Sequence, residues 1–255
     1  MRARVRILAH CHFISIAVAV FSSILHLSST ASAADPDCET LNHSWKTKYY
    51  KDFGVQWPLV HFRCPTQTSE IALTLYHLEH LKFTPNSKGY SPNFYSFAKK
   101  YIEQIAYLPK DKDYPNTTVA AAGHPYEDSV LGTIFGKTVR RMTLNDIFFF
   151  TDESMRASTI VHEASHFRPD DPSHVNCSHG DMSTEIGNQA CDAKFYDTDG
   201  RGSGYNYDFI FHAWVRDHLT NNELEKSVSN EKMTYLLLNR FNEYTNDQVK
   251  KWILN

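Results

Sequence analysis

The sequence predicts a helix-dominated α+β protein with a small sheet. Stretches without glycine or proline carry apolar residues at helical spacing, and short β-prone runs and clusters of turn-forming residues lie between them. The composition is 42% hydrophobic and 22% charged, with only 10 Gly and 10 Pro. Such a composition is typical of a globular protein and excludes a collagen-like, low-complexity or disordered chain.

The first 33 residues have the pattern of a secretory signal peptide. Three arginines within the first six residues precede a mainly apolar run at 13–27, and the tripeptide Ala-Ser-Ala at 31–33 supplies a cleavage site. The apolar run is shorter than the roughly 20 residues that a membrane span needs. We therefore expect an exported, monomeric protein of one domain, residues 34–255, with no membrane association after cleavage.

The charge of the mature chain argues against nucleic acid as a partner. Removing the three leader arginines leaves 23 basic and 29 acidic residues, a net charge of −6. A protein that binds phosphates or an anionic membrane needs clustered lysine and arginine, and no such cluster is left.

Four cysteines follow the leader, an even number that predicts two disulfides in an exported protein. Three pairings are possible, and we expect the one that is local in sequence, Cys38–Cys64 and Cys177–Cys191. A cysteine-based zinc site is disfavoured because the chain has no C-x-x-C pair.

Helices are predicted in the N-terminal half at 68–83, which opens with Thr and Ser, and at 91–108, which lies between two prolines. A short strand is expected at 118–122, among turn-forming residues. The aromatic run at 145–151 is β-prone, and Val119–Gly123 and Ile147–Phe150 are candidates for an edge strand.

The second half is predicted to contain three further helices. The first begins at Asp152-Glu153-Ser154 and continues through 155–167, a stretch without glycine or proline. Residues 168–201 are rich in turn formers. Helices follow at 207–219 and 222–254.

The strongest functional motif is His162-Glu163-x-x-His166. Residues four apart share one face of a helix, so two imidazoles can bind one metal ion, and Glu163 lies beside them. Zinc lowers the pKa of bound water to about 7, and a neighbouring carboxylate can move the proton to the leaving amine. The motif therefore predicts a Zn²⁺ site with Glu163 as general base.

A catalytic zinc site needs a third protein ligand. His174 lies eight residues after His166, whereas the metzincin pattern places its third histidine at six with a glycine between, so we do not expect His174 to bind. Glu185 has a gluzincin-like spacing, and Asp181 and Asp192 are the aspartate alternatives. Spacing alone leaves these three open.

Residues 156–167, RASTIVHEASHF, resemble the active-site helix of the aspzincin (deuterolysin-like) metalloendopeptidases. That family continues with G-T-x-D-x-x-Y-G, whose Asp binds zinc and whose Tyr stabilises the oxyanion. The nearest equivalent here is Cys191-Asp192 followed, after additional residues, by Gly204-Tyr205. The resemblance implies a zincin-like fold with Asp192 as third ligand and Tyr205 as oxyanion donor, and a Cys177–Cys191 disulfide would carry Asp192 toward the helix.

The resulting prediction is a secreted zinc endopeptidase acting on protein or peptide substrates. The alternatives are an exported module with structural zinc and a zinc amide hydrolase acting on cell-wall peptides. Other histidines are expected to have structural roles: His77 and His80 on a solvated helix face, and His212 or His218 at most supporting the zinc ligands.

Overall fold

The computed structural model describes residues 35–56, 58–80, 93–107, 120–123, 139–178, 190–196, 202–219 and 223–254. All of them belong to one compact unit, Ala31–Asn255. The predicted signal peptide lies outside the described residues, so its removal stays a prediction. Among the described helices, none combines the length and apolar character needed to cross a membrane.

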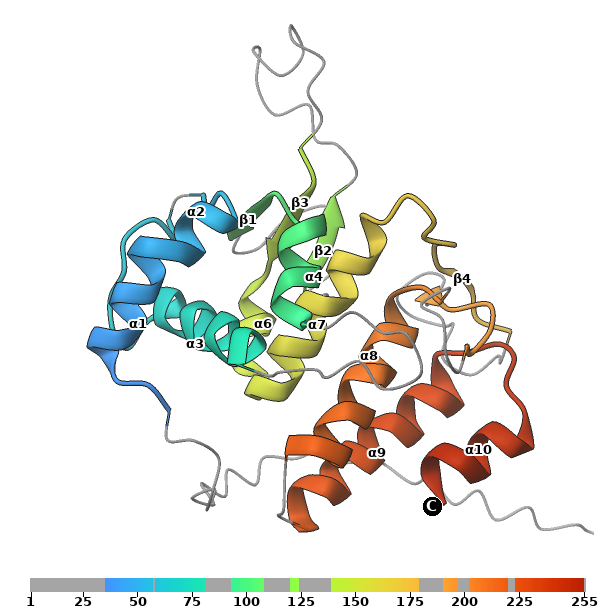
Figure 1. Cartoon of the computed structure of the whole chain (residues 1–255). Coiled ribbons are helices and arrows are strands. Elements are labelled where there is room, and N and C mark those ends of the chain that lie inside the picture. The colour runs from blue at the N-terminus through green and yellow to red at the C-terminus, as the bar shows by residue number, and fades with distance from the viewer. Residues whose placement is uncertain are drawn as a thin grey trace, which may run out of the picture. The chain divides into compact units, whose positions relative to one another are not determined.

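Helices dominate this part of the chain (Figure 1). The N-terminal helices are α1 (Cys38–Ser44), continued by a π-helical turn (Trp45–Tyr49) and α2 (Tyr50–Asp52), then α3 (Gln67–His80) and α4 (Phe94–Tyr101). The later helices are α6 (Asp146–Phe150), α7 (Glu153–His166), α8 (Gly204–Trp214) with a π-helical turn (Val215–Leu219), α9 (Glu223–Asn239) and α10 (Asn246–Ile253).

A three-stranded sheet has the order β1-β3-β2. Strand β1 (Gln104–Tyr107) runs parallel to β3 (Arg141–Leu144), and β2 (Ala120–Gly123) pairs antiparallel with the other side of β3. Ile105 lies opposite Met142, and both are fully buried. Because β-branched and long apolar side chains on one face of the sheet pack into the core, this register joins the strands to the helices.

Helix α7 is the central element, packing against α3, α4, α8 and β2 (Figure 1). The helix starts where the sequence predicts, and Asp152 caps it by accepting a hydrogen bond from the backbone N–H of Met155. Ten of its 14 residues are buried, and several of these are Ala or Ser. Small side chains let neighbouring helices approach α7 closely. The close packing encloses most of the helix, including its two histidines and Glu163.

Helix α8 joins two apolar clusters. Phe211 and Trp214 pack with the main core beneath α3, α4 and α7, while Phe209 and Ala213 pack with residues of α9. Since α8 is covered on both sides, its first turn is held firmly against α7.

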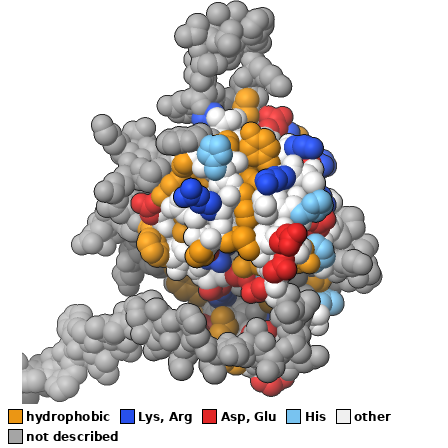
Figure 2. Space-filling model, turned by 90° about the vertical axis from the view of Figure 1, so that its left-hand side faces the viewer, with side chains coloured by type: hydrophobic (Ala, Val, Ile, Leu, Met, Phe, Trp, Pro, Cys, Tyr) orange, Lys and Arg blue, Asp and Glu red, His pale blue; other side chains and the backbone are white. Residues whose placement is uncertain are grey.

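The two disulfides confirm the predicted pairing. Cys38–Cys64 and Cys177–Cys191 have Cα–Cα distances of 6.2 and 5.1 Å. The second one links two very short antiparallel strands, β4 (Val175–Asn176) and β5 (Ala190–Cys191). Figure 2 shows the face on the side of α1 and α3, where basic, acidic and apolar side chains all appear.

The predicted helix at 91–108 is wrong in its second half. Helix α4 ends at Tyr101, and Gln104–Tyr107 forms β1. Pairing with β3 buries Ile105 and Ala106, and this tertiary contact outweighs the helical spacing of the isolated segment.

The aromatic run near residue 148 is a helix, not the predicted strand. In α6, Phe148 is buried whereas Phe150 is 87% exposed. The short helix therefore packs Phe148 into the core and leaves Phe150 at the surface. The strand expected near residues 118–123 is present as β2, and the helix predicted over 222–254 is two helices. Thr245 and Gln248 form a capping box that starts α10.

Candidate metal centre

The last two turns of α7 supply two imidazoles on one face. His162 and His166, one helical turn apart, have ring centroids 5.0 Å apart. Both rings are largely enclosed, and Glu163 between them is also buried, with 7% of its surface exposed. The predicted motif is therefore on a helix and inside the protein, as metal binding by i and i+4 histidines requires.

The chain reverses direction directly after α7. The guanidinium of Arg168, only 4% exposed, donates hydrogen bonds to the carbonyl of Gly202 at 3.1 Å and to the hydroxyl of Tyr207 at 2.8 Å. Ser173 then adopts a left-handed conformation with φ of 59°. These two features return the chain to the end of the helix and place His174 beside the α7 histidines.

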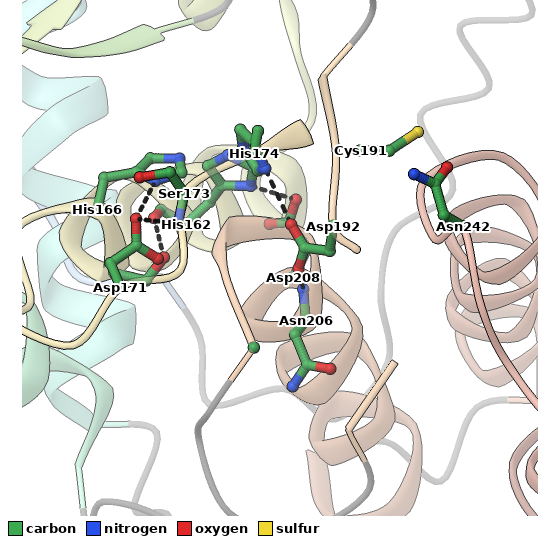
Figure 3. Close-up of polar contacts among 12 residues, drawn as sticks. His162, His166, Asp171, Ser173, His174, Cys191, Asp192, Asn206, Asp208 and Asn242 are labelled. Atoms are coloured by element: carbon green, nitrogen blue, oxygen red, sulfur yellow. Dashed lines mark hydrogen bonds and ion pairs between the residues drawn. The ribbon is translucent and has the colours of Figure 1, made fainter. Parts of the chain in front are cut away.

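His174 completes a group of three potential metal ligands (Figure 3). Its Nε2 lies 3.2 Å from Nε2 of His162, and its ring centroid is 4.5 Å from that of His166. One ring nitrogen from each of the three histidines lies within 4.8 Å of the others. The spacing argument against His174 is wrong, because the three histidines together form a possible metal site.

Each of the three imidazoles has its own carboxylate. Nδ1 of His162 lies 2.9 Å from Asp208, Nδ1 of His166 lies 3.1 Å from Asp171, and Nδ1 of His174 lies 2.9 Å from Asp192. A carboxylate that holds Nδ1–H fixes the tautomer and leaves Nε2 to bind metal. Three nitrogen ligands oriented in this way fit zinc, as well as copper, iron or nickel.

Asp192 was predicted as the third ligand, and the structure places it behind His174 instead. Its Oδ1 faces His174, and its Oδ2 accepts a hydrogen bond from the backbone N–H of Asn206 at 2.9 Å. With both oxygens engaged and 1% of its surface exposed, Asp192 is suited to orient an imidazole. The other two alternatives, Glu185 and Asp181, lie outside the described residues.

Burial and neighbouring charge act differently on the α7 histidines. Burial lowers the pKa of His162 to about 3, although the charge of Glu163 opposes the shift. Burial also acts to lower the pKa of His166, but the hydrogen bond to Asp171 and the charge of Glu163 raise it overall. Burial raises the pKa of Asp208 well above its usual range. His162 is thus held in the neutral form that binds metal.

Tyr205 lies against the imidazoles, in the region where it was predicted to act. Its ring stacks on His174 at 4.7 Å and meets His162 edge-on at 4.8 Å. The guanidinium of Arg240 lies 4.9 Å from the centre of the same ring. Burial raises the pKa of Tyr205, so its phenol stays protonated at neutral pH.

Gly204 lets α8 approach the site closely. A Cβ at this position would lie 2.4 Å from Nε2 and 2.5 Å from Cε1 of His162. Real Cβ atoms do not come this near to other heavy atoms, so the backbone of α8 can lie against the imidazole only because residue 204 is glycine.

Two other predicted histidine roles can be compared with the structure. His212 lies 3.5 Å from the hydroxyl of Ser154, away from the metal ligands; the residue of α8 that supports them is Asp208. His77 contacts Glu153 through Nδ1 and lies 3.4 Å from Asp35 through Nε2. The two carboxylates thus face different ring nitrogens, and burial lowers the pKa of this imidazole.

Comparison of the chain with protein-family models, with curated proteins and with solved structures finds no match.

Proposed function

We propose that the chain is a zinc-dependent hydrolase of peptide bonds, with His162, His166 and His174 as the metal ligands. The observation that carries the proposal is the convergence of three imidazoles, each held at Nδ1 by a different carboxylate. Catalytic zinc sites characteristically use three protein ligands and keep one position for water, whereas structural sites usually have four. Within the described residues the group has three members.

Bound zinc would supply a water of lowered pKa and would polarise the carbonyl of the scissile bond. Glu163 directly follows His162 on α7, and its side chain is buried, with 7% of its surface exposed. We assign to Glu163 the transfer of the proton from the attacking water to the leaving nitrogen.

Tyr205 is assigned to the carbonyl oxygen. A protonated phenol beside the ligands can donate a hydrogen bond to that oxygen as negative charge develops on it, and the raised pKa keeps the proton in place. The ring of Tyr205 lies in contact with both the imidazole of His174 and the guanidinium of Arg240. These two contacts limit the orientations that the Tyr205 ring can adopt.

A zincin-like architecture is the arrangement that we infer for the domain. Support comes from the placement of the mixed sheet next to the motif helix, with β2 at an edge of that sheet and packed on α7. In zincins an edge strand above the metal helix pairs with extended substrate, and β2 includes four of the five residues of the candidate edge strand Val119–Gly123. The likeness to aspzincins extends over α7, while the proposed third ligand, His174, departs from their Asp.

We place the protein outside the cytoplasm, as a monomer acting on a protein or peptide substrate. Two disulfides support an oxidising compartment, in keeping with the predicted signal peptide.

The test is digestion of an unfolded protein by the oxidised chain 34–255 loaded with zinc. Glu163→Gln removes the proton acceptor while keeping the shape of the side chain, so cleavage should be lost and zinc should remain bound. Glu153→Gln makes the same change at the other end of α7 and should leave cleavage unaltered. A chelator should abolish cleavage, and zinc should restore it.

Three outcomes would contradict the proposal. Full activity of Glu163→Gln would remove its mechanism. Stoichiometric zinc without cleavage of proteins or of cell-wall peptides would favour the structural-zinc alternative, and cleavage of cell-wall peptides alone would favour the amide hydrolase. Absence of zinc binding would leave the histidines with a purely structural role.

A further inference from the structure

The Cys177–Cys191 disulfide lies next to the third imidazole. Val175 and Cys191 face each other across the pair β4–β5, and His174 and Asp192 are the residues directly outside that pair. The disulfide, the strand pairing and the 2.9 Å contact between His174 and Asp192 therefore join the same two segments. Figure 3 shows the contact between His174 and Asp192.

The two joined segments are anchored very differently. Cys191 and Asp192 are buried, with 0% and 1% of their surface exposed. The backbone N–H of Asp192 donates to the carbonyl of Arg240 at 2.8 Å, and its carbonyl accepts from the backbone N–H of Asn242 at 3.0 Å. The β5 segment is thereby fixed to the segment after α9, on both sides of the fully buried Phe241.

The β4 segment, in contrast, has little packing of its own. Both of its residues are exposed, Val175 by 39%. The side chain of Asn242 donates to the carbonyl of Asn176 at 2.8 Å and accepts from the backbone N–H of Ser178 at 2.7 Å. Exposed hydrogen bonds of this kind contribute little to stability because water competes for both partners. The covalent link to Cys191 is thus the strongest tie described on the C-terminal side of His174, whereas Arg168 and the turn at Ser173 hold its N-terminal side.

We propose that the Cys177–Cys191 disulfide positions His174 as a metal ligand, so that the zinc site is complete only in the oxidised protein. The inference rests on the proposed function, since it takes His174 to be a ligand. In the reduced chain, His162 and His166 keep their places on α7, whereas His174 is held only from its N-terminal side, by Arg168 and the turn at Ser173, so its distance to them is less well fixed. A chain whose cysteines are reduced then holds zinc weakly and is inactive.

Oxidation transfers two electrons and two protons from the thiols of Cys177 and Cys191 to another disulfide, such as oxidised glutathione, which becomes two thiols. The new bond fixes the β4 segment to β5. No other oxidant is required.

The first experiment compares zinc affinity between two matched disulfide variants. Cys177→Ser with Cys191→Ser removes the link beside His174, whereas Cys38→Ser with Cys64→Ser removes the link between α1 and the segment before α3, which contain none of the three ligands. Competition with a chromophoric chelator should show zinc binding weakened about 10- to 100-fold in the first variant, as for loss of ligand support. The second variant should bind like the unaltered chain.

A mutant cycle tests whether the disulfide acts through His174. In a His174→Ala background, loss of Cys177–Cys191 should cause no further weakening of zinc binding. An undiminished further loss would overturn the inference, as would equal weakening by the two disulfide variants. If the unaltered chain binds no zinc, the proposed function fails with it; if all variants bind equally, only the present inference fails.

A second measurement uses the unaltered protein and does not depend on the folding of a variant. Because linkage is reciprocal, zinc should make Cys177–Cys191 harder to reduce by the same factor by which the disulfide tightens zinc binding. In a buffer of reduced and oxidised glutathione at controlled free zinc, alkylation and mass spectrometry give the oxidised fraction of each pair. Zinc should protect Cys177–Cys191 and leave Cys38–Cys64 unchanged; equal or absent protection would refute the inference.

Discussion

His212 should make the stability of the protein fall in mild acid. It lies on α8 with 1% of its surface exposed, and burial lowers its pKa to about 3. The unfolded chain exposes the same imidazole, whose ordinary pKa is about 6.5. Protons therefore bind to the unfolded state first as the pH falls, and folding loses free energy from pH 6.5 downward.

The size of this effect follows from linkage. Between pH 7.5 and pH 5, one histidine that is protonated only when unfolded lowers the free energy of unfolding by about 2 kcal/mol. His212→Gln removes the group, so the variant should lose about 2 kcal/mol of that pH dependence, whatever its stability at neutral pH. Exposed His43 offers the control: His43→Gln should leave the pH dependence as it is.

The assay is urea unfolding at several pH values between 5 and 7.5, with both disulfides intact and with chelator present so that metal binding does not contribute. The chain and both variants are compared by the change in free energy across this range. An unaltered pH dependence in His212→Gln, or an equal change in His43→Gln, would refute the link between burial of His212 and acid sensitivity.

Three further substitutions test the surroundings of the site. Asp192→Asn should weaken zinc binding about 10- to 100-fold with little change in overall fold, as measured by chelator competition and circular dichroism, because it weakens the support of His174. Gly204→Ala should weaken zinc binding still more in the same assay, since its methyl group would displace the ring of His162. Arg168→Met should lower stability by about 1–3 kcal/mol in urea unfolding, because it removes the donor of two hydrogen bonds after α7. Unchanged zinc affinity in the first two, or unchanged stability in the third, would contradict these roles.

Local features of the sequence predict a substantial part of the site. Helix α7 and its cap at Asp152, the pairing of the four cysteines and the placement of Tyr205 near the motif all follow from patterns within short segments or from the resemblance to a family. Such features depend on spacing, capping and compartment, which one sequence contains.

The third imidazole depends instead on how the chain turns. His174 reaches the site because Arg168 fastens the segment after α7 to Gly202 and because Ser173 takes a left-handed conformation. Neither feature follows from a spacing rule, and a third histidine eight residues after the second does not match the metzincin pattern. The errors at β1 and α6 have the same origin, since pairing and packing with distant residues decide those segments.

The first turns of α8 explain why Gly204-Tyr-Asn-Tyr-Asp208 occurs as a unit. Tyr205 and Asp208 are three residues apart, so both face α7 and meet His162, while Gly204 leaves room for that ring. The backbone N–H of Asn206, in the first turn of the helix, donates both to the carbonyl of Ser203 at 3.1 Å and to Asp192 at 2.9 Å. The start of α8 therefore supports two of the proposed ligands, His162 on α7 and, through Asp192, His174. Substitutions in this turn should accordingly change metal affinity more than they change the stability of the fold.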